Sequence, residues 1–393
     1  MLDHYAKRIE KLRFSSSLMS MRRIRELRAN GIKVHDFGSK FDTPAHIKAA
    51  AARYMNSPQG SLYADPRGIP EFRAAVQRKL LRENGLAVDP DTEITATPGG
   101  KAGIVATLLA LVDSGDEVIL EDPGWLSFEP MIRITGATPV PVPLHESNGF
   151  RLDAADIRKA VTPRTKVIVL CSPHNPTGAV LSRAELEAIA GVAIEHDLHV
   201  VMDEAYEHFL YDGHAHVSMA TIEGMRARTI TVQTASKTYN MFGWRVGWVI
   251  APAEISERIR MISSHMFTCV TSFAQAGAAA ALDGDHVQGT LTLPEMMKNY
   301  QIQRNALVEG LRAIPGVTCV MPAGAYFAFP RISGFGRSSQ DFAALLLDRA
   351  RVNGLPGSVF GQRGEGHIRF VFNAPLPEIE EGVAHLQECL RAL

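Results

Sequence analysis

The stretch KVIVLCSPHNPTG at residues 166–178 decides the fold class, because a β-branched apolar run ends there in a proline- and glycine-rich turn. Five other short apolar runs share this character: EVILEDP (117–123), TPVPVPL (138–144), HVVMDEA (199–205), RTITVQTAS (228–236) and RVGWVIAP (245–252). Helical stretches such as residues 183–197 separate most of them. Strands that are apolar on both faces and alternate with helices predict an α/β fold with a mainly parallel sheet covered by helices.

The pattern differs towards both ends of the chain. Apolar residues recur every three positions over residues 15–30, which predicts an amphipathic helix. After residue 290 come a predicted long helix (294–314), the segment VTCVMPAGAYFAFP (317–330), a helix (340–353), the strand HIRFVFN (367–373) and a closing helix. We therefore expect a large domain over residues 45–288 and a smaller α+β domain built from both chain ends, residues 1–44 and 289–393.

Composition narrows the class of protein. The 393 residues are 46% hydrophobic and 21% charged, as in ordinary folded soluble proteins, and the net charge of -1 gives no electrostatic reason to expect nucleic acid as a partner. The four cysteines lie far apart without zinc-type spacing, which indicates free thiols in a reducing cytoplasm. No apolar run approaches the roughly 20 residues of a membrane span, and the N-terminus lacks a signal-peptide core. We expect a cytoplasmic protein without a membrane partner.

Chemically distinctive side chains follow the predicted strands, where ligands bind in open α/β sheets. They are Trp125, Asn175, Asp203, Tyr206, Lys237 and Arg245. Taken singly, each has an ordinary explanation, such as a solvated charge, a turn residue or a core aromatic. The Asp-Glu pair at the end of one strand also fits a magnesium site, but the glycine turn at residues 98–101 lacks the remaining residues of a nucleotide-binding loop.

Together these residues match the needs of a pyridine aldehyde that carries a phosphate. Such a cofactor requires a lysine for the imine, an acid for the ring nitrogen, a donor for the phenolic oxygen, an aromatic side chain against the ring, and an anion cradle with an arginine. The sequence supplies one group of each kind within the predicted large domain. Pyridoxal 5′-phosphate (PLP) is therefore the expected cofactor, and no metal is expected.

An ordered series of motifs carries a family resemblance. The series comprises YADPRGIPEFR (63–73), NPTG (175–178), DEAY (203–206), SKTYNMFGWRVG (236–247) and IRFVF (368–372). It resembles the class I aminotransferases of fold type I, and within them the bacterial branch of the aspartate aminotransferase family. The resemblance implies a transaminase of amino-acid metabolism that transfers an amino group from an amino acid to a 2-oxo acid, with PLP held as a Schiff base on Lys237.

The resemblance also implies a role for each matching residue. Lys237, Asp203 and Tyr206 are expected to be catalytic: Lys237 as the proton shuttle, Asp203 as partner of the ring nitrogen, and Tyr206 together with Asn175 as donors to the phenolic oxygen. Trp125 is expected to lie against the cofactor ring. The phosphate is expected to bind the groups at Gly100, Lys101, Thr234, Ser236 and Arg245.

Substrate contacts follow from the same resemblance. Arg369 is expected to bind the substrate α-carboxylate, helped by the backbone N–H of Gly38, with Trp125 and Asn175 nearby. Tyr63 is expected to reach the phosphate of the neighbouring subunit, which implies a homodimer.

Two departures from the family pattern bear on the substrate. Thr234 stands where the family has glycine or serine, although the hydroxyl is retained. The loop at residues 38–44, GSKFDTP, is shorter than the family's and lacks its proline. Lys101, and Lys40 in the shortened loop, are candidate cations for a distal carboxylate, which predicts acidic substrates; alternatively Lys101 contributes only its backbone and Lys40 is solvated.

Other functions fit the sequence less well than a transaminase. A same-fold PLP enzyme that catalyses β-elimination or a specialised biosynthetic reaction is the main alternative, since these enzymes share the PLP-binding residues. A non-enzymatic PLP-binding effector domain is disfavoured because the first predicted helix leaves no room for a DNA-binding motif. A nicotinamide dehydrogenase is disfavoured because no Gly-x-Gly-x-x-Gly follows a first strand. His214 and His216 are expected to be solvated.

Overall fold

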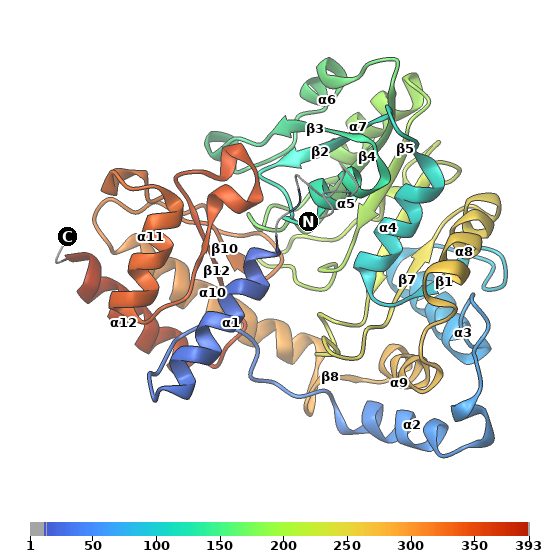
Figure 1. The fold of residues 1–393 in the computed structure, drawn as a ribbon, viewed down its shortest axis with the longest axis horizontal. Helices are drawn as coiled ribbons and strands as arrows, with labels where there is room; N and C mark the ends of the chain where they lie inside the picture. Colours follow the sequence, from blue (N-terminus) through green and yellow to red (C-terminus); the bar gives the residue numbers. More distant parts are fainter. Residues whose placement is uncertain (1–11, 13, 392–393) are drawn as a thin grey trace, which may run out of the picture.

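The computed structural model describes residue 12 and residues 14–391. Its centre is a seven-stranded sheet with the order β1-β7-β6-β5-β4-β2-β3 (Figure 1). The strands are β1 (Ile94–Thr97), β2 (Glu117–Asp122), β3 (Thr138–Pro143), β4 (Thr165–Cys171), β5 (His199–Asp203), β6 (Thr229–Thr234) and β7 (Gly247–Ile250). Strands β6, β5, β4, β2 and β3 pair in parallel, whereas β7 runs antiparallel to both β1 and β6. The predicted mainly parallel sheet is confirmed.

The sheet buries a hydrophobic core on each of its two faces. Along β4, Val167 and Val169 belong to one core and Ile168 and Leu170 to the other, because successive side chains of a strand point to opposite faces. The larger core is closed by α2 (Ala45–Met55), α3 (Pro70–Lys79), α4 (Gly100–Leu111), α5 (Phe128–Thr135), α8 (Ala253–Phe267) and α9 (Ser272–Asp283). The second core is closed by α6 (Ala154–Ala160) and α7 (Arg183–Glu195).

The third strand departs from the uniform burial that its sequence suggested. β3 lies at the edge of the sheet, and most of its residues are partly or fully exposed. An edge strand needs ladder hydrogen bonds on one side only, so the prolines at positions 139, 141 and 143 are tolerated there.

A smaller α+β unit contains segments from both ends of the chain, with α1 lying beside the C-terminal helices (Figure 1). A three-stranded sheet has the order β10-β12-β11. The smaller unit contains α1 (Ser16–Ala29), α10 (Leu293–Arg312), β10 (Phe327–Ala328), α11 (Ser339–Leu345), β11 (Leu355–Pro356), β12 (Ile368–Val371) and α12 (Leu376–Arg391). The hairpin of β8 (His286–Gln288) and β9 (Leu291–Thr292) comes between α9 of the large unit and α10 of the smaller one. The predicted two-part fold class is confirmed, and the exact boundaries at residues 44/45 and 288/289 stay predictions.

Local sequence signals account for where several helices begin and end. α7 and α10 each open with a capping box, at Ser182 and Thr292 respectively, in which the cap and a glutamate three residues later satisfy each other's free groups. Helix α3 continues into a π-helical turn at Leu80–Asn84, which is followed by Gly85 at φ +66°. Within the described part of the chain, no helix combines the length and hydrophobicity of a bilayer span.

Candidate active site

A cavity of about 320 Å³ lies at the carboxyl edge of the large sheet. Ten of the predicted site residues line it: Gly100, Lys101, Trp125, Asn175, Asp203, Tyr206, Thr234, Ser236, Lys237 and Arg245. They reach the cavity from segments that follow β1, β2, β4, β5 and β6, because strands that run in one direction end at one edge. Its volume is within the usual range for a small-molecule site.

Three glycines shape one end of this cavity, where α4 begins. Gly99 has φ +80°, and a Cβ at this position would lie 2.3 Å from Nη2 of Arg245. A Cβ at Gly247 would lie 2.8 Å from the backbone N of Gly100. The arginine and strand β7 therefore approach the first turn of α4 closely only because these side chains are missing. The free N–H groups of a helix start, together with a guanidinium, form a site for an anion such as a phosphate.

The anion end continues into a hydroxyl pair and a fixed arginine. The Thr234 hydroxyl donates to Ser236 Oγ at 2.9 Å or to the Val246 carbonyl at 3.0 Å. The Arg245 guanidinium donates to the backbone carbonyls of Phe242 (3.1 Å) and Pro98 (3.1 Å). These carbonyls hold its plane in place and leave further donors for a ligand.

Asp203 is the buried carboxylate of the cavity. The backbone N–H of Ala205 donates to its Oδ1 at 3.1 Å. Burial raises the pKa of Asp203 to about 6, against the opposing effects of this hydrogen bond and of Lys237. A buried carboxylate with a raised pKa favours a cationic partner, and a protonated pyridine nitrogen is such a partner.

The two lysines of the cavity lie against aromatic faces. Lys237 Nζ is 5.5 Å from the ring centroid of Tyr206 and 5.2 Å from that of Phe242. Lys101 Nζ is 5.2 Å from the ring centroid of Trp125. Partial desolvation and the nearby cations Arg245 and Lys237 lower the pKa of Lys101. Cations that repel one another in a shared cavity favour the binding of an anionic ligand.

Arg369 enters the site from the smaller sheet. Its Nη1 donates to Asn175 Oδ1 at 3.0 Å, and its guanidinium lies 4.6 Å and 4.9 Å from the ring centroids of Phe327 and Phe360. Burial lowers the pKa of Arg369 to about 10, and its Nε is buried without a hydrogen-bond partner among the described residues. A desolvated guanidinium with an unused donor suits a carboxylate ligand.

Besides Arg369, three other predicted contacts, Gly38, Lys40 and Tyr63, lie outside the cavity lining. The backbone N–H of Gly38 donates to Asp36 Oδ1 at 3.2 Å, and Lys40 Nζ bonds the same carboxylate at 2.9 Å. Lys40 is thus neutralised by Asp36, with Glu378 also 3.8 Å away, which disfavours its suggested role as a second cation for the substrate. Tyr63 is 88% exposed in the single chain.

The shortened loop nevertheless lies beside the lysine segment. The Ser39 hydroxyl donates to Asn240 Oδ1 at 3.0 Å, and the Thr43 hydroxyl donates to the Asn240 carbonyl at 2.9 Å. Because Asn240 is three residues after Lys237, these bonds place the loop next to the segment that carries the lysine.

The prediction for His216 was wrong. His214 is exposed, but the side chain of His216 is 9% exposed and its Nε2 lies 3.2 Å from Glu204 Oε2. Burial alone would lower the pKa of His216, whereas Glu204 raises it above the ordinary value, and the net pKa is raised. A polar sequence context concealed this buried ion pair, which lies directly behind Asp203.

Sequence reasoning missed the aromatic wall of the site. Phe242 and Ala205 line the cavity, and Tyr326 and Phe327 pack edge-to-face on Tyr206, each with ring centroids 5.3 Å away. Their positions in the sequence could have indicated them. Phe242 is within the lysine motif, and Tyr326 and Phe327 belong to the aromatic-rich segment GAYFAFP.

Comparisons with known proteins agree with this geometry. The family model for aminotransferases of class I and II matches residues 32–386. An aspartate aminotransferase of Pyrococcus abyssi is 39% identical over 89% of both chains. An aromatic-amino-acid aminotransferase of Thermococcus litoralis is 38% identical, again over 89% of both chains. The solved structure of an aspartate aminotransferase from Thermus thermophilus with maleate superposes with a TM-score of 0.92, at 34% identity over 98% of this chain and all of that one.

Proposed function

This chain belongs to the class I and II aminotransferases and is a PLP-dependent transaminase, and from that premise we propose that its preferred substrates are dicarboxylic amino acids and 2-oxo acids. The observation that carries the proposal is the ammonium of Lys101. It lies over Trp125 in the cavity, and within the described part of the chain it has no carboxylate within 4 Å. A distal substrate carboxylate would supply the missing counter-charge.

The residues of the cavity fit PLP. We propose that the start of α4, the Thr234 and Ser236 hydroxyls and Arg245 hold the phosphate, because a side chain at Gly99 would fill this cradle. Asp203 would pair with the ring nitrogen, and Trp125 would pack against the ring. When bound, the cofactor supplies an electron sink and accepts the amino group of the substrate.

Proton transfer is assigned to Lys237. Its ammonium is held between the rings of Tyr206 and Phe242, in the same cavity as the proposed cofactor groups. In this proposal the neutral amine of Lys237 takes the proton from the substrate Cα as a general base, and the ammonium so formed returns a proton as a general acid. The Asp203 carboxylate keeps a proton on the pyridine nitrogen, and the Tyr206 and Asn175 side chains donate to the phenolic oxygen.

Arg369 positions the substrate. We propose that it binds the α-carboxylate through donors that include the unpaired Nε, while its bond to Asn175 fixes the plane of the guanidinium. The α-carboxylate at Arg369 and a distal carboxylate at Lys101 would orient an aspartate-like substrate at both ends. The Thermus thermophilus aspartate aminotransferase was solved with maleate, a dicarboxylate, which supports this proposal.

An amino-donor screen without an acceptor tests the substrate class. Holoenzyme is mixed with aspartate, glutamate, phenylalanine or alanine, and the 2-oxo acid released is measured per active site. We expect aspartate and glutamate to react fastest and to stop at one 2-oxo acid per site. Faster reaction with phenylalanine, to which the name of the Thermococcus litoralis relative points, would refute the acidic preference. None of these four donors has a suitable β-leaving group, so β-elimination is tested separately with β-chloroalanine, from which continued pyruvate release would indicate that reaction.

The assembly is also a proposal. Exposed apolar side chains lie in and near α2 and α8, namely Met55, Leu62, Tyr63, Met261 and Met266. A cavity of about 830 Å³, which Arg245 also lines, is bounded by α2, by residues 243–245 and by residues 269–274, and most of its lining side chains are apolar. We propose that a second copy of the chain covers this surface and that Tyr63 of each copy then reaches the phosphate site of the other. We also propose that the homodimer works in the cytoplasm, where the four free thiols of each chain stay reduced.

A further inference from the structure

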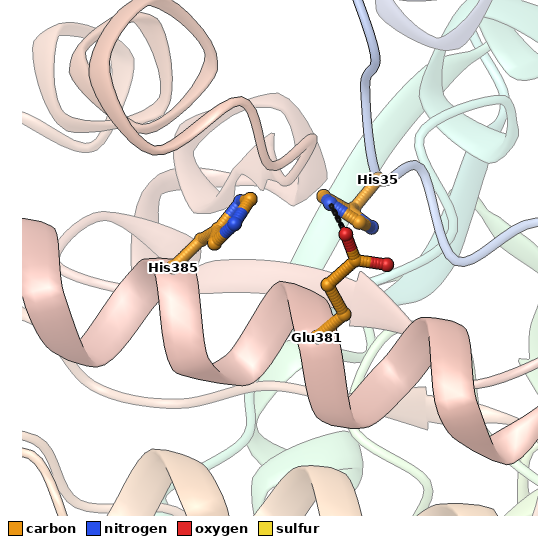
Figure 2. A group of neighbouring side chains, drawn as sticks. All are labelled: His35, Glu381 and His385. Atoms are coloured by element: carbon orange, nitrogen blue, oxygen red, sulfur yellow. Dashed lines mark ion pairs between the residues drawn. The ribbon is translucent and has the colours of Figure 1, made fainter.

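A second group of polar side chains gathers in the smaller domain, away from the cavity. His35 precedes the loop that begins at Gly38, and Glu381 and His385 project from α12 into the same space (Figure 2). Glu381 and His385 are four residues apart, so they share one face of the helix. Each of the three offers a ligand atom, and these atoms lie within 4.8 Å of one another.

His35 is a buried imidazole without a partner. Its side chain is 1% exposed, and both of its ring nitrogens are buried without a hydrogen bond among the described residues. The nearest carboxylate oxygen, on Glu381, is 3.9 Å from Nε2. The ring of His385 meets that of His35 edge-on with centroids 5.0 Å apart. Burying an unsatisfied polar group is costly, so this imidazole indicates a missing ligand.

We propose that His35, Glu381 and His385 bind a zinc ion. Two imidazoles and one carboxylate form a common zinc ligand set, and water completes the tetrahedron. Zinc bonds of roughly 2.0–2.1 Å place tetrahedral ligand atoms about 3.4 Å apart, slightly closer than they stand here. The side chain of Glu381 is 44% exposed and His385 is partly exposed, so both have room to rotate, and we expect this rotation to close the difference.

Lys33 competes with the ion for Glu381. Its Nζ bonds the two carboxylate oxygens at 2.5 and 2.6 Å. The lysine side chain is 67% exposed, so it can turn into solvent when the metal binds. Removing Lys33 should therefore strengthen metal binding, because it removes both a competitor and a nearby positive charge. Removing a surface lysine that does not bond a metal ligand should leave the zinc affinity unchanged.

The other comparable group does not suit a metal. Glu204, Glu207 and His216 also lie close together, but their carboxylates already have strong partners. The buried Lys79 ammonium bonds Glu207, and the Ser218 hydroxyl donates to Glu204 at 2.7 Å. The ring nitrogens of His216 are also buried without a hydrogen bond among the described residues, but its Nε2 lies 3.2 Å from Glu204 Oε2, and Lys79 already supplies a cation to this group. His35 differs because its nearest carboxylate oxygen is 3.9 Å away and that carboxylate belongs to an exposed side chain.

The zinc would join two distant parts of the chain. The His35 backbone pairs with the segment before β11, since its N–H donates to Arg351 O and its carbonyl accepts from Asn353 N–H, each at 2.8 Å. The metal would also link His35 to α12. His35 lies three residues before the loop that begins at Gly38. We expect bound zinc to raise the unfolding temperature, since a ligand that binds the folded state stabilises it.

A zinc titration of untagged, full-length holoenzyme tests the proposal. Zinc affinity and stoichiometry are measured by competition with a chromogenic chelator in wild type, H385Q, E381Q, K33A and the control H145Q, which alters an exposed histidine of the large domain. We expect one tight zinc per wild-type chain and at least about tenfold weaker binding in H385Q and E381Q. K33A should bind more tightly, and H145Q should match wild type.

Thermal unfolding gives a second readout that is independent of turnover. Zinc should raise the melting temperature of wild type and H145Q but not that of H385Q or E381Q. Equal zinc affinity in wild type and H385Q, or weaker binding by K33A than by wild type, would overturn the assignment. Both readouts are independent of the proposed substrate class, so failure of one proposal leaves the other standing.

Discussion

The guanidinium of Arg369 donates to the side-chain oxygen of Asn175 at 3.0 Å, which ties strand β12 of the smaller sheet to the turn after β4 of the larger one. Two aromatic rings flank the arginine, and its Nε is left unpaired. The donor is therefore held in place before a substrate arrives, and little side-chain entropy remains to be lost on binding.

Replacing Arg369 by alanine should reduce kcat/KM for amino-acid donors by about 10²- to 10³-fold, mainly through KM. This range corresponds to roughly 3–4 kcal/mol for a desolvated, charge-assisted contact. Steady-state kinetics with aspartate and with a matched amine that lacks the α-carboxylate provide the measurement. The slow reaction of the amine should not change; equal losses for both compounds would exclude carboxylate binding by Arg369.

Replacing Asp203 by asparagine should stabilise the cofactor-free protein and impair the enzyme. The folded-state pKa of about 6 is above the ordinary value of 3.8 for an aspartate, so Asp203 favours folding most at low pH, and this contribution is lost as the pH rises towards 6 and beyond. At pH 8 the buried carboxylate therefore costs on the order of 2–3 kcal/mol. Asparagine removes this cost and retains an oxygen for the Ala205 N–H.

Urea unfolding of the cofactor-free forms at pH 5 and pH 8 measures this effect. Wild type should lose more stability than D203N over this interval, while D203N should bind PLP more weakly and turn over far more slowly. An unchanged turnover rate with PLP bound would show that Asp203 does not support the ring nitrogen.

Replacing Lys237 by alanine should reduce kcat by about 10³-fold or more, because no other base of the cavity is proposed to act at the substrate Cα. Added methylamine or ethylamine should restore part of the rate, since a small amine can occupy the vacated space and move the proton. Near-normal turnover without added amine would disprove the assignment of Lys237. The D203N form is the useful comparison, because small amines should not rescue it.

Mixed dimers test whether Tyr63 serves the neighbouring site. K237A supplies an intact Tyr63, and Y63A supplies an intact Lys237. When the two inactive or weakened forms are unfolded together and refolded, a hybrid should contain one complete site and be more active than either parent. If mixing gives only the average of the two parents, Tyr63 acts within its own chain or not at all.

The sequence predicted the sheet and the cavity lining well, because both depend on local signals. Strand ends such as Asp203 are marked by the apolar run before them, and parallel strands bring their ends together. The hydrogen bond between Arg369 and Asn175, 194 positions apart, has no local signal: the family resemblance implied a substrate contact for each residue but did not predict their bond. The burial of His216 was missed for the same reason. His216 lies in a polar loop whose composition indicates exposure, and its partner Glu204 lies outside that loop, at the end of the preceding strand.

The ionic surroundings of Lys40 and Lys101 were equally hidden from the sequence. The sequence made both lysines candidates to bind a distal carboxylate of the substrate. Only the folded chain shows that Asp36 already neutralises Lys40, while Lys101 lies over Trp125 in the cavity. This difference decides which lysine should be altered to test substrate specificity.

Replacing Lys101 by alanine should lower the preference for acidic over neutral substrates. One attractive ion pair in a partly closed site contributes about 1–3 kcal/mol, so the ratio of kcat/KM for aspartate to that for phenylalanine should fall about ten- to a hundredfold. The lowered pKa of Lys101 adds a pH dependence: the ammonium loses its charge as the pH rises, so the aspartate preference should decline earlier than for an ordinary lysine.

K40A is the matched control, because it removes a lysine of the same chemistry whose charge is already paired with Asp36. Its aspartate-to-phenylalanine ratio should equal that of wild type. An unchanged ratio in K101A would mean that Lys101 contributes only its backbone at the start of α4. A fall in K40A alone would mean that the shortened loop rearranges when substrate binds and that Lys40, freed from Asp36, reads the distal carboxylate.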